Sequence, residues 1–138
     1  MMAKTRENTE FVQRKFQEIA VNLSSAVPFT WSAIVLGIFL TGKENTTHIQ
    51  LWAKQGKNGH YENLMKSFWD DDSFLECTER IQESCIALHQ HCKEAHDDWR
   101  EFSFVLLPDG TFTADFQYEN IPEITSYFVA EWQSRFLI

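Results

Sequence analysis

A short turn between two alternating segments constrains the fold of this chain more than any other feature. The turn is Leu107-Pro108-Asp109-Gly110-Thr111. Proline presets φ, aspartate can bond the turn backbone, and glycine readily takes a left-handed conformation. Apolar side chains occupy every second position on both sides, which is typical of strands with one buried face; they are Phe102, Phe104 and Leu106, then Phe112, Ala114, Phe116 and Tyr118. The pattern predicts a β-hairpin over residues 102–118.

A second hairpin is predicted earlier in the chain. Residues 31–40 are almost continuously apolar and rich in Ile, Val and Leu, which indicates a strand buried on both faces. A turn cluster at 41–45 leads into an alternating segment at 46–53. Residues 55–59 then indicate a loop, and the segment from there to Asp70 fits no single element.

Helical spacing of apolar residues predicts three helices around these hairpins. The first has its apolar residues from Phe11 to Leu23, Thr5 or Asn8 could cap its start, and Pro28 lies just beyond its end. The second begins near Asp72 or Ser73 and runs to Ala95. The third is expected to open at Pro122, because proline suits the first turn of a helix. The predicted fold class is α+β, in the order helix, hairpin, long helix, hairpin, helix. A mostly antiparallel sheet would be covered by the helices.

Composition narrows the class of protein. The chain has 138 residues, so a single domain over residues 1–138 is expected. Its net charge of −8 disfavours binding to nucleic acid or to an anionic membrane. No apolar stretch reaches the roughly 18 residues of a membrane span, and the charged segment from Met1 to Lys15 is unlike a secretory signal. Three clustered cysteines do not suit a disulfide framework, so a cytoplasmic location is expected.

Negative charge is concentrated in one segment, which we interpret as a candidate partner-binding surface. Residues 70–101 hold ten acidic and three basic residues, a net charge of −7, whereas residues 1–69 carry +3. Clustered charge speeds capture of a basic partner, and an exposed tryptophan beside it would resemble an interface hot spot. The alternative is a solvated, solubilising face. The candidate residues are Trp69, Asp70, Asp71, Asp72, Glu76, Glu79, Glu83, Asp97 and Asp98.

A stripe of cysteine and histidine offers the main alternative, a metal- or thiol-dependent enzyme. Cys85, His89, Cys92 and His96 follow offsets of 4, 3 and 4 along the second predicted helix. The ends of this stripe are about 16 Å apart at 1.5 Å per residue, so at most two of the four could share one ion. Buried small thiols flanked by histidines explain the pattern more simply. We therefore expect no metal, no cofactor and no catalytic residue.

Two groups of motifs, one before the first predicted strand and one in the later hairpin, match the pattern of a known family. Pro28-Phe29-Thr30-Trp31 precedes the first strand. The later hairpin resembles the family pattern "W..F.F.L..DG.F..DF.Y" over Trp99–Leu106, Pro108–Phe112 and Asp115–Glu119. By these motifs the chain resembles the YezG-like family of small bacterial immunity proteins, or antitoxins, and the resemblance covers most of the chain in the order of its elements. Its specific part is about twenty residues near the second hairpin.

The resemblance implies a cytoplasmic protein without catalytic activity. Such proteins bind and neutralise a toxin domain encoded by a neighbouring gene, often a nuclease, in polymorphic toxin or contact-dependent growth inhibition systems. A nuclease presents positive charge to its substrate, so an acidic inhibitor is electrostatically matched to it. The family motifs assign no binding residue, and a generic interaction module with another partner stays open as an alternative.

Overall fold

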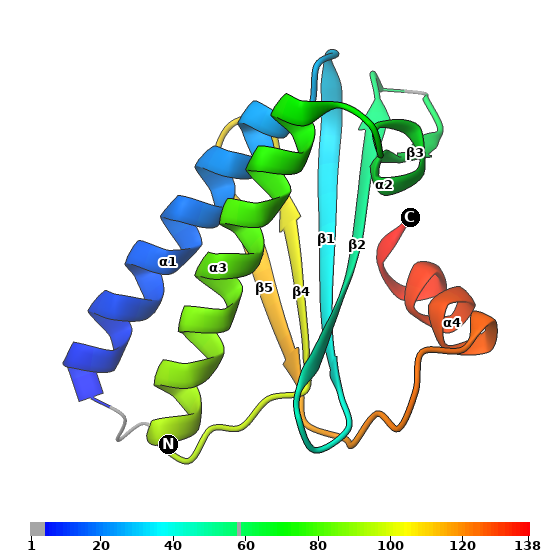
Figure 1. The fold of residues 1–138 in the computed structure, drawn as a ribbon. Coiled ribbons are helices and arrows are strands. Elements are labelled where there is room, and N and C mark those ends of the chain that lie inside the picture. Colours follow the sequence, from blue (N-terminus) through cyan, green and yellow to red (C-terminus); the bar gives the residue numbers. More distant parts are fainter. Residues whose placement is uncertain (1–4, 58) are drawn as a thin grey trace. The chain divides into compact units, whose positions relative to one another are not determined.

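The computed structural model describes residues 5–57 and 59–138, which form an α+β fold (Figure 1). The predicted fold class is confirmed. The elements in chain order are α1 (Thr5–Ala26), β1 (Trp31–Thr41), β2 (Thr46–Gln55), β3 (Tyr61–Asn63), α2 (Leu64–Ser67), α3 (Asp72–Glu94), β4 (Glu101–Leu106), β5 (Phe112–Gln117) and α4 (Ser126–Phe136).

The strands form one sheet in the order β3-β2-β1-β4-β5, and every neighbouring pair is antiparallel. β1 lies at the centre, where Gly37 is paired with Gln50 of β2 and with Ser103 of β4. From Ala33 to Thr41 every residue of β1 is buried. The continuous apolar run therefore predicted this central strand correctly, because a strand covered on both faces has no solvent side to alternate toward.

The segment that matched no single pattern contains β3 and α2. Only three residues of β3 pair with β2, with Tyr61 opposite Lys54 and Asn63 opposite Trp52. A strand of three residues is too short to show a period of two, so the fifth strand was not predicted.

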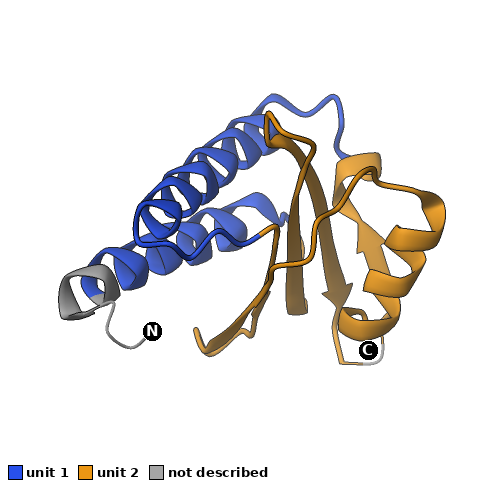
Figure 2. Ribbon diagram, turned by 90° about the horizontal axis from the view of Figure 1, so that it is seen from below, with its two compact units in different colours: residues 1–28, 68–99 blue, residues 29–67, 100–138 orange. Residues whose placement is uncertain are grey.

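The chain divides into two compact units, each built from two separate segments (Figure 2). One unit comprises residues 1–28 and 68–99, and the other residues 29–67 and 100–138. In the first, α1 and α3 run side by side in opposite directions (Figure 1). Glu18 of α1 accepts a 3.1 Å hydrogen bond from the Ser84 hydroxyl of α3. The single domain over residues 1–138 stays a prediction.

In the second unit, α4 covers one face of the sheet (Figure 1). Its fully buried Trp132 packs with Val35 and Phe39 of β1, and the rings of Phe39 and Trp132 meet edge to face at 5.6 Å. A Cβ atom on Gly37 would lie 2.6 Å from a ring carbon of Trp132. Glycine at this position therefore leaves the space that the indole fills.

The predicted start of the last helix is wrong. α4 begins at Ser126, and the Thr125 side chain caps it by accepting a 3.0 Å hydrogen bond from the Phe128 backbone N–H. Before it, the buried Ile121 forms a parallel bridge with Thr41 at the end of β1. That pairing holds the chain extended beside Pro122, so the helix begins only at the next good cap.

The turn between β4 and β5 has the predicted chemistry. Gly110 has φ of +90°, and its backbone N–H donates to the Leu107 carbonyl at 2.9 Å. The Asp109 carboxylate accepts 3.0 Å and 2.7 Å hydrogen bonds from the backbone N–H and the hydroxyl of Thr111. These bonds lower the pKa of Asp109 because they favour the charged carboxylate.

We expect Gly110→Val to lower the free energy of unfolding by roughly 1–2 kcal/mol, because a β-branched residue is penalised at positive φ. Open space surrounds this position, so the backbone and not a clash would cause the loss. Urea denaturation measures the change. Gly110→Asn is the matched control and should lose less, since asparagine tolerates this conformation. Equal stability of the valine variant and the parent chain would contradict the turn assignment.

Candidate partner-binding surface

The three consecutive aspartates before and at the start of α3 have different roles. Asp71 is the N-cap, with φ of −93° and ψ of 116°, and its carboxylate accepts a 2.9 Å hydrogen bond from the Phe74 backbone N–H. Its negative charge also lies at the positive end of the helix dipole. Asp70 and Asp72 are exposed beside it. Asp71 is therefore committed to the helix, and its two neighbours present their charges to solvent.

We expect Asp71→Ala to cost about 1 kcal/mol of unfolding free energy, the usual loss for an N-cap. Asp70→Ala is the matched control. It removes the same charge one residue earlier but no capping bond, so it should change stability by less than about 0.5 kcal/mol. Thermal and urea unfolding of the two variants measure the difference. Equal losses would show that local charge, and not the cap, stabilises the start of α3.

Along α3, the acidic residues lie on the side opposite the buried one. Glu76, Glu79 and Glu83 are exposed, as predicted. Glu76 lies 3.6 Å from Arg80 in an exposed ion pair, an interaction that contributes at most about 1 kcal/mol. Within the described part of the chain, Glu79 and Glu83 form no ion pair. The buried side is formed by Phe74, Cys77, Thr78, Ile81, Ser84, Cys85, Leu88, His89 and Cys92.

Trp69 lies in the turn immediately before α3 and is 70% exposed. Two further apolar side chains of α3, Leu75 and Ile86, are also exposed. An exposed tryptophan with unpaired carboxylates around it is typical of an interface hot spot, in which a central aromatic residue is surrounded by charged residues. We call Trp69, Asp70, Asp72, Glu76, Glu79 and Glu83 the α3 acidic surface.

Asp97 and Asp98 belong to the end of α3. His96 has φ of +65°, its backbone N–H donates to the Lys93 carbonyl, and the Asp97 N–H donates to the Cys92 carbonyl. This pair of bonds is a Schellman motif, which stops a helix. Asp98 lies 2.8 Å from Nε2 of the buried His89. Asp98 is thus engaged within the fold, while its side chain stays 47% exposed.

Structural roles account for most of the cysteine and histidine stripe. Cys85 is fully enclosed, and burial raises the pKa of its thiol far above the ordinary range, so the nucleophilic thiolate is not available. His89 is held by Asp98, and His96 forms the helix stop. Among the side chains described at residues 10–57 and 59–138, no group of three or more His, Cys, Asp or Glu is placed to hold a metal ion.

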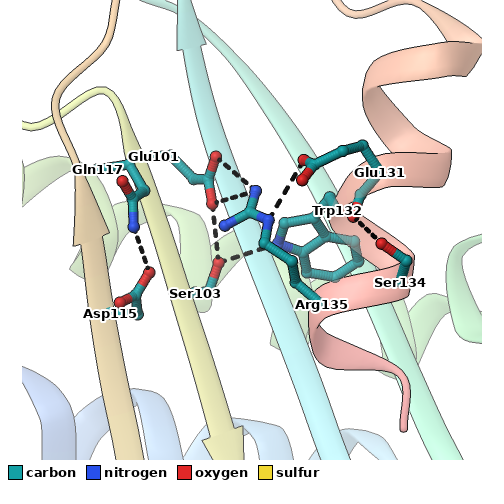
Figure 3. Close-up of polar contacts among 8 residues, drawn as sticks. All are labelled: Glu101, Ser103, Asp115, Gln117, Glu131, Trp132, Ser134 and Arg135. Carbon is teal, nitrogen blue, oxygen red and sulfur yellow. Dashed lines mark hydrogen bonds and ion pairs between the residues drawn. The ribbon is translucent and has the colours of Figure 1, made fainter.

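A second set of polar residues, missed by the sequence analysis, lies on the sheet beneath α4 (Figure 3). The buried Glu101 carboxylate accepts a 3.1 Å hydrogen bond from Nη2 of Arg135, whose Nε donates to Glu131 at 3.2 Å. Ser103 accepts a 2.9 Å bond from the indole N–H of Trp132. Arg135 is the only lysine or arginine between positions 102 and 138, and it lies four residues after Glu131. These two features of the sequence could have suggested that Arg135 takes part in a polar network.

Glu101 is an unusual residue for a buried strand position, because its side chain is only 5% exposed. Burial raises the pKa of its carboxyl, the guanidinium of Arg135 lowers it, and the charges of Asp115 and Glu131 raise it further. Burial is the largest of these influences, so the carboxyl holds its proton more strongly than it would in water. Arg135 therefore compensates a charge that the sheet alone would leave unpaired.

Fold and surface define a small acidic α+β protein that presents carboxylates and an exposed tryptophan to solvent. A family model described as immunity protein YezG-like matches residues 12–133. The chain belongs to the YezG-like immunity protein family, and its role is that of an immunity protein, which implies a cognate toxin as partner. A search among curated proteins found no match. In the described residues, no helix has the length and apolar character needed to cross a bilayer.

Proposed function

We propose that this immunity protein neutralises a nuclease toxin with a basic surface by binding it stoichiometrically in the cytoplasm of the producing cell. Its action is non-enzymatic. The observation that carries the proposal is the α3 acidic surface, whose carboxylates at Asp70, Glu79 and Glu83 are exposed and make no ion pair among the described residues. The aspartates at 97 and 98 extend the negative field, and Asp71 contributes its charge while capping the helix.

Charge complementarity supports the nuclease as target. An enzyme that binds a polyanion must carry clustered positive charge near its active site. An acidic inhibitor is attracted to that region over long distances, and such steering raises association rates by about 10–10³-fold at low salt. The exposed Trp69 supports the same proposal, because a large apolar ring buried in a contact acts as an aromatic anchor, and a few such anchors contribute most of the binding energy. Carboxylates then direct the approach and the tryptophan holds the complex.

Co-expression with the toxin domain encoded next to this gene tests the proposal. We expect the pair to purify as a 1:1 complex, the cells to survive, and purified immunity protein to abolish DNA or RNA cleavage at one molar equivalent. A non-cognate toxin from the same class is the control and should stay active. A toxin that forms a complex but has no nuclease activity would overturn the nuclease assignment. Absence of a complex would overturn neutralisation by binding.

A further inference from the structure

A recess of about 640 Å³ lies in the second unit, between the ends of β4 and β5, the segment at 119–125 and the first turns of α4. Its residues all belong to the second unit, whereas the residues of the α3 acidic surface belong to the first. Its apolar wall is formed by Ile121, Pro122 and Phe128. The volume is large enough for several side chains, so a short polypeptide segment can enter it.

The charge of this recess is strongly negative. Four carboxylates line it, from Glu101, Glu119, Glu123 and Glu131, against one guanidinium, from Arg135. Arg135 is already bonded to Glu101 and Glu131 (Figure 3), so its single positive charge is shared between these two carboxylates. Glu119 and Glu123 are exposed and form no ion pair with the side chains described at residues 10–57 and 59–138. Negative charge without an internal partner therefore remains at the mouth.

An exposed aromatic ring completes the recess. Tyr127 is 82% exposed, among the most exposed large apolar side chains, although it lies in the first turn of α4. A tyrosine face attracts a guanidinium or ammonium group, and an apolar wall accommodates the aliphatic stem of the same side chain. Arginine fits the apolar wall, the uncompensated carboxylates and the exposed tyrosine ring together. It combines a long apolar stem with a planar cation that binds both aromatic faces and carboxylates.

We propose that the recess binds an arginine-containing basic segment of the partner protein, as a contact separate from the α3 acidic surface. The partner's identity as the toxin rests on the proposed function. The preference of the recess for arginine does not rest on the proposed function, because it follows from the cavity, the uncompensated carboxylates and the exposed ring of Tyr127.

The first test uses the peptide acetyl-Gly-Arg-Gly-Arg-Gly-amide, titrated into the full-length protein and followed by backbone NMR shifts. We expect saturable shifts confined to residues 117–131. The neutral peptide with citrulline in place of arginine should cause none. Glu119→Gln with Glu123→Gln should weaken peptide binding about fivefold, since each exposed pair contributes a fraction of a kcal/mol. The matched control, Glu10→Gln with Glu94→Gln, removes two exposed carboxylates that belong neither to the recess nor to the α3 acidic surface, and it should leave the affinity unchanged.

Three results of this titration would overturn the proposal: equal shifts with the citrulline peptide, shifts centred on α3, or unchanged affinity in the Glu119→Gln, Glu123→Gln variant. A second arm uses the purified complex with the neighbouring toxin. There the same double variant should raise the dissociation constant about fivefold or more. A toxin that does not bind the parent chain would refute the proposed function, while the peptide titration would still decide whether the recess accepts arginine.

Discussion

Trp132→Ala is expected to lower the free energy of unfolding by about 3–5 kcal/mol, the usual loss when a large buried aromatic side chain is removed. Trp132 is fully buried and joins α4 to the central strand through Val35 and Phe39. Its removal would leave a cavity above Gly37, which has no side chain to fill the space. It would also leave the Ser103 hydroxyl without its indole donor. Urea denaturation followed by circular dichroism measures the loss.

Two further variants separate the causes of that loss. Trp132→Phe keeps most of the ring but removes the N–H donor, so it should cost about 1–3 kcal/mol. Tyr127→Ala truncates another aromatic residue of α4 that is 82% exposed, and it should change stability by less than about 0.5 kcal/mol. A Trp132→Ala variant no less stable than Tyr127→Ala would show that α4 contributes little to the folded unit.

Reversing three charges of the α3 acidic surface should slow toxin association by about tenfold or more at low salt. The variant carries Asp70→Lys, Glu79→Lys and Glu83→Lys, all at exposed positions. Asp71 is left intact because it caps α3, so folding should be preserved. The dependence of the association rate on ionic strength should also become weaker, because steering acts through screened charge. Stopped-flow or surface-based kinetics at two salt concentrations measure both effects, with circular dichroism as the folding control.

A variant with the same change in net charge tests whether position matters. Glu10→Lys, Glu44→Lys and Glu94→Lys also reverse three exposed carboxylates, but outside the α3 acidic surface. This control should slow association less than the first triple. Equal slowing by both triples would mean that only the overall charge steers the toxin. If the Asp70→Lys, Glu79→Lys, Glu83→Lys variant is well folded and still associates with the toxin at the rate of the parent chain, the α3 acidic surface serves only to keep the protein soluble.

The elements that sequence predicted well are those with a local physical cause. The 107–111 turn has Asp109 and Gly110 at the positions where a side-chain acceptor and a positive φ are needed. β1 is recognisable because burial on both faces leaves an unbroken apolar run. The exposed acidic side of α3 follows from the helical period, since its buried residues occupy the opposite side. Family membership was also evident from the motifs around the second hairpin.

Local pattern could not distinguish residues whose roles depend on a neighbour. Asp70, Asp71 and Asp72 are alike in sequence, and only the observed start of α3 makes Asp71 the cap. Pro122 has the features of a helix start, but the bridge between Ile121 and Thr41 keeps the chain extended there. In both cases the observed backbone geometry distinguishes positions that the sequence alone makes equally acceptable as a helix start.

The amino-acid sequence by itself determined the α+β class, the central strand, the second hairpin, the concentration of negative charge on α3 and the immunity family. The tertiary structure alone decided which polar groups meet. Glu101 and Arg135 are 34 positions apart, and Ser103 and Trp132 are 29 apart. Periodicity reports which side of an element is buried, whereas a bond between a strand and a distant helix depends on register and packing. The recess beside this network exists for the same reason, because it forms only where α4 and the segment before it return to the sheet.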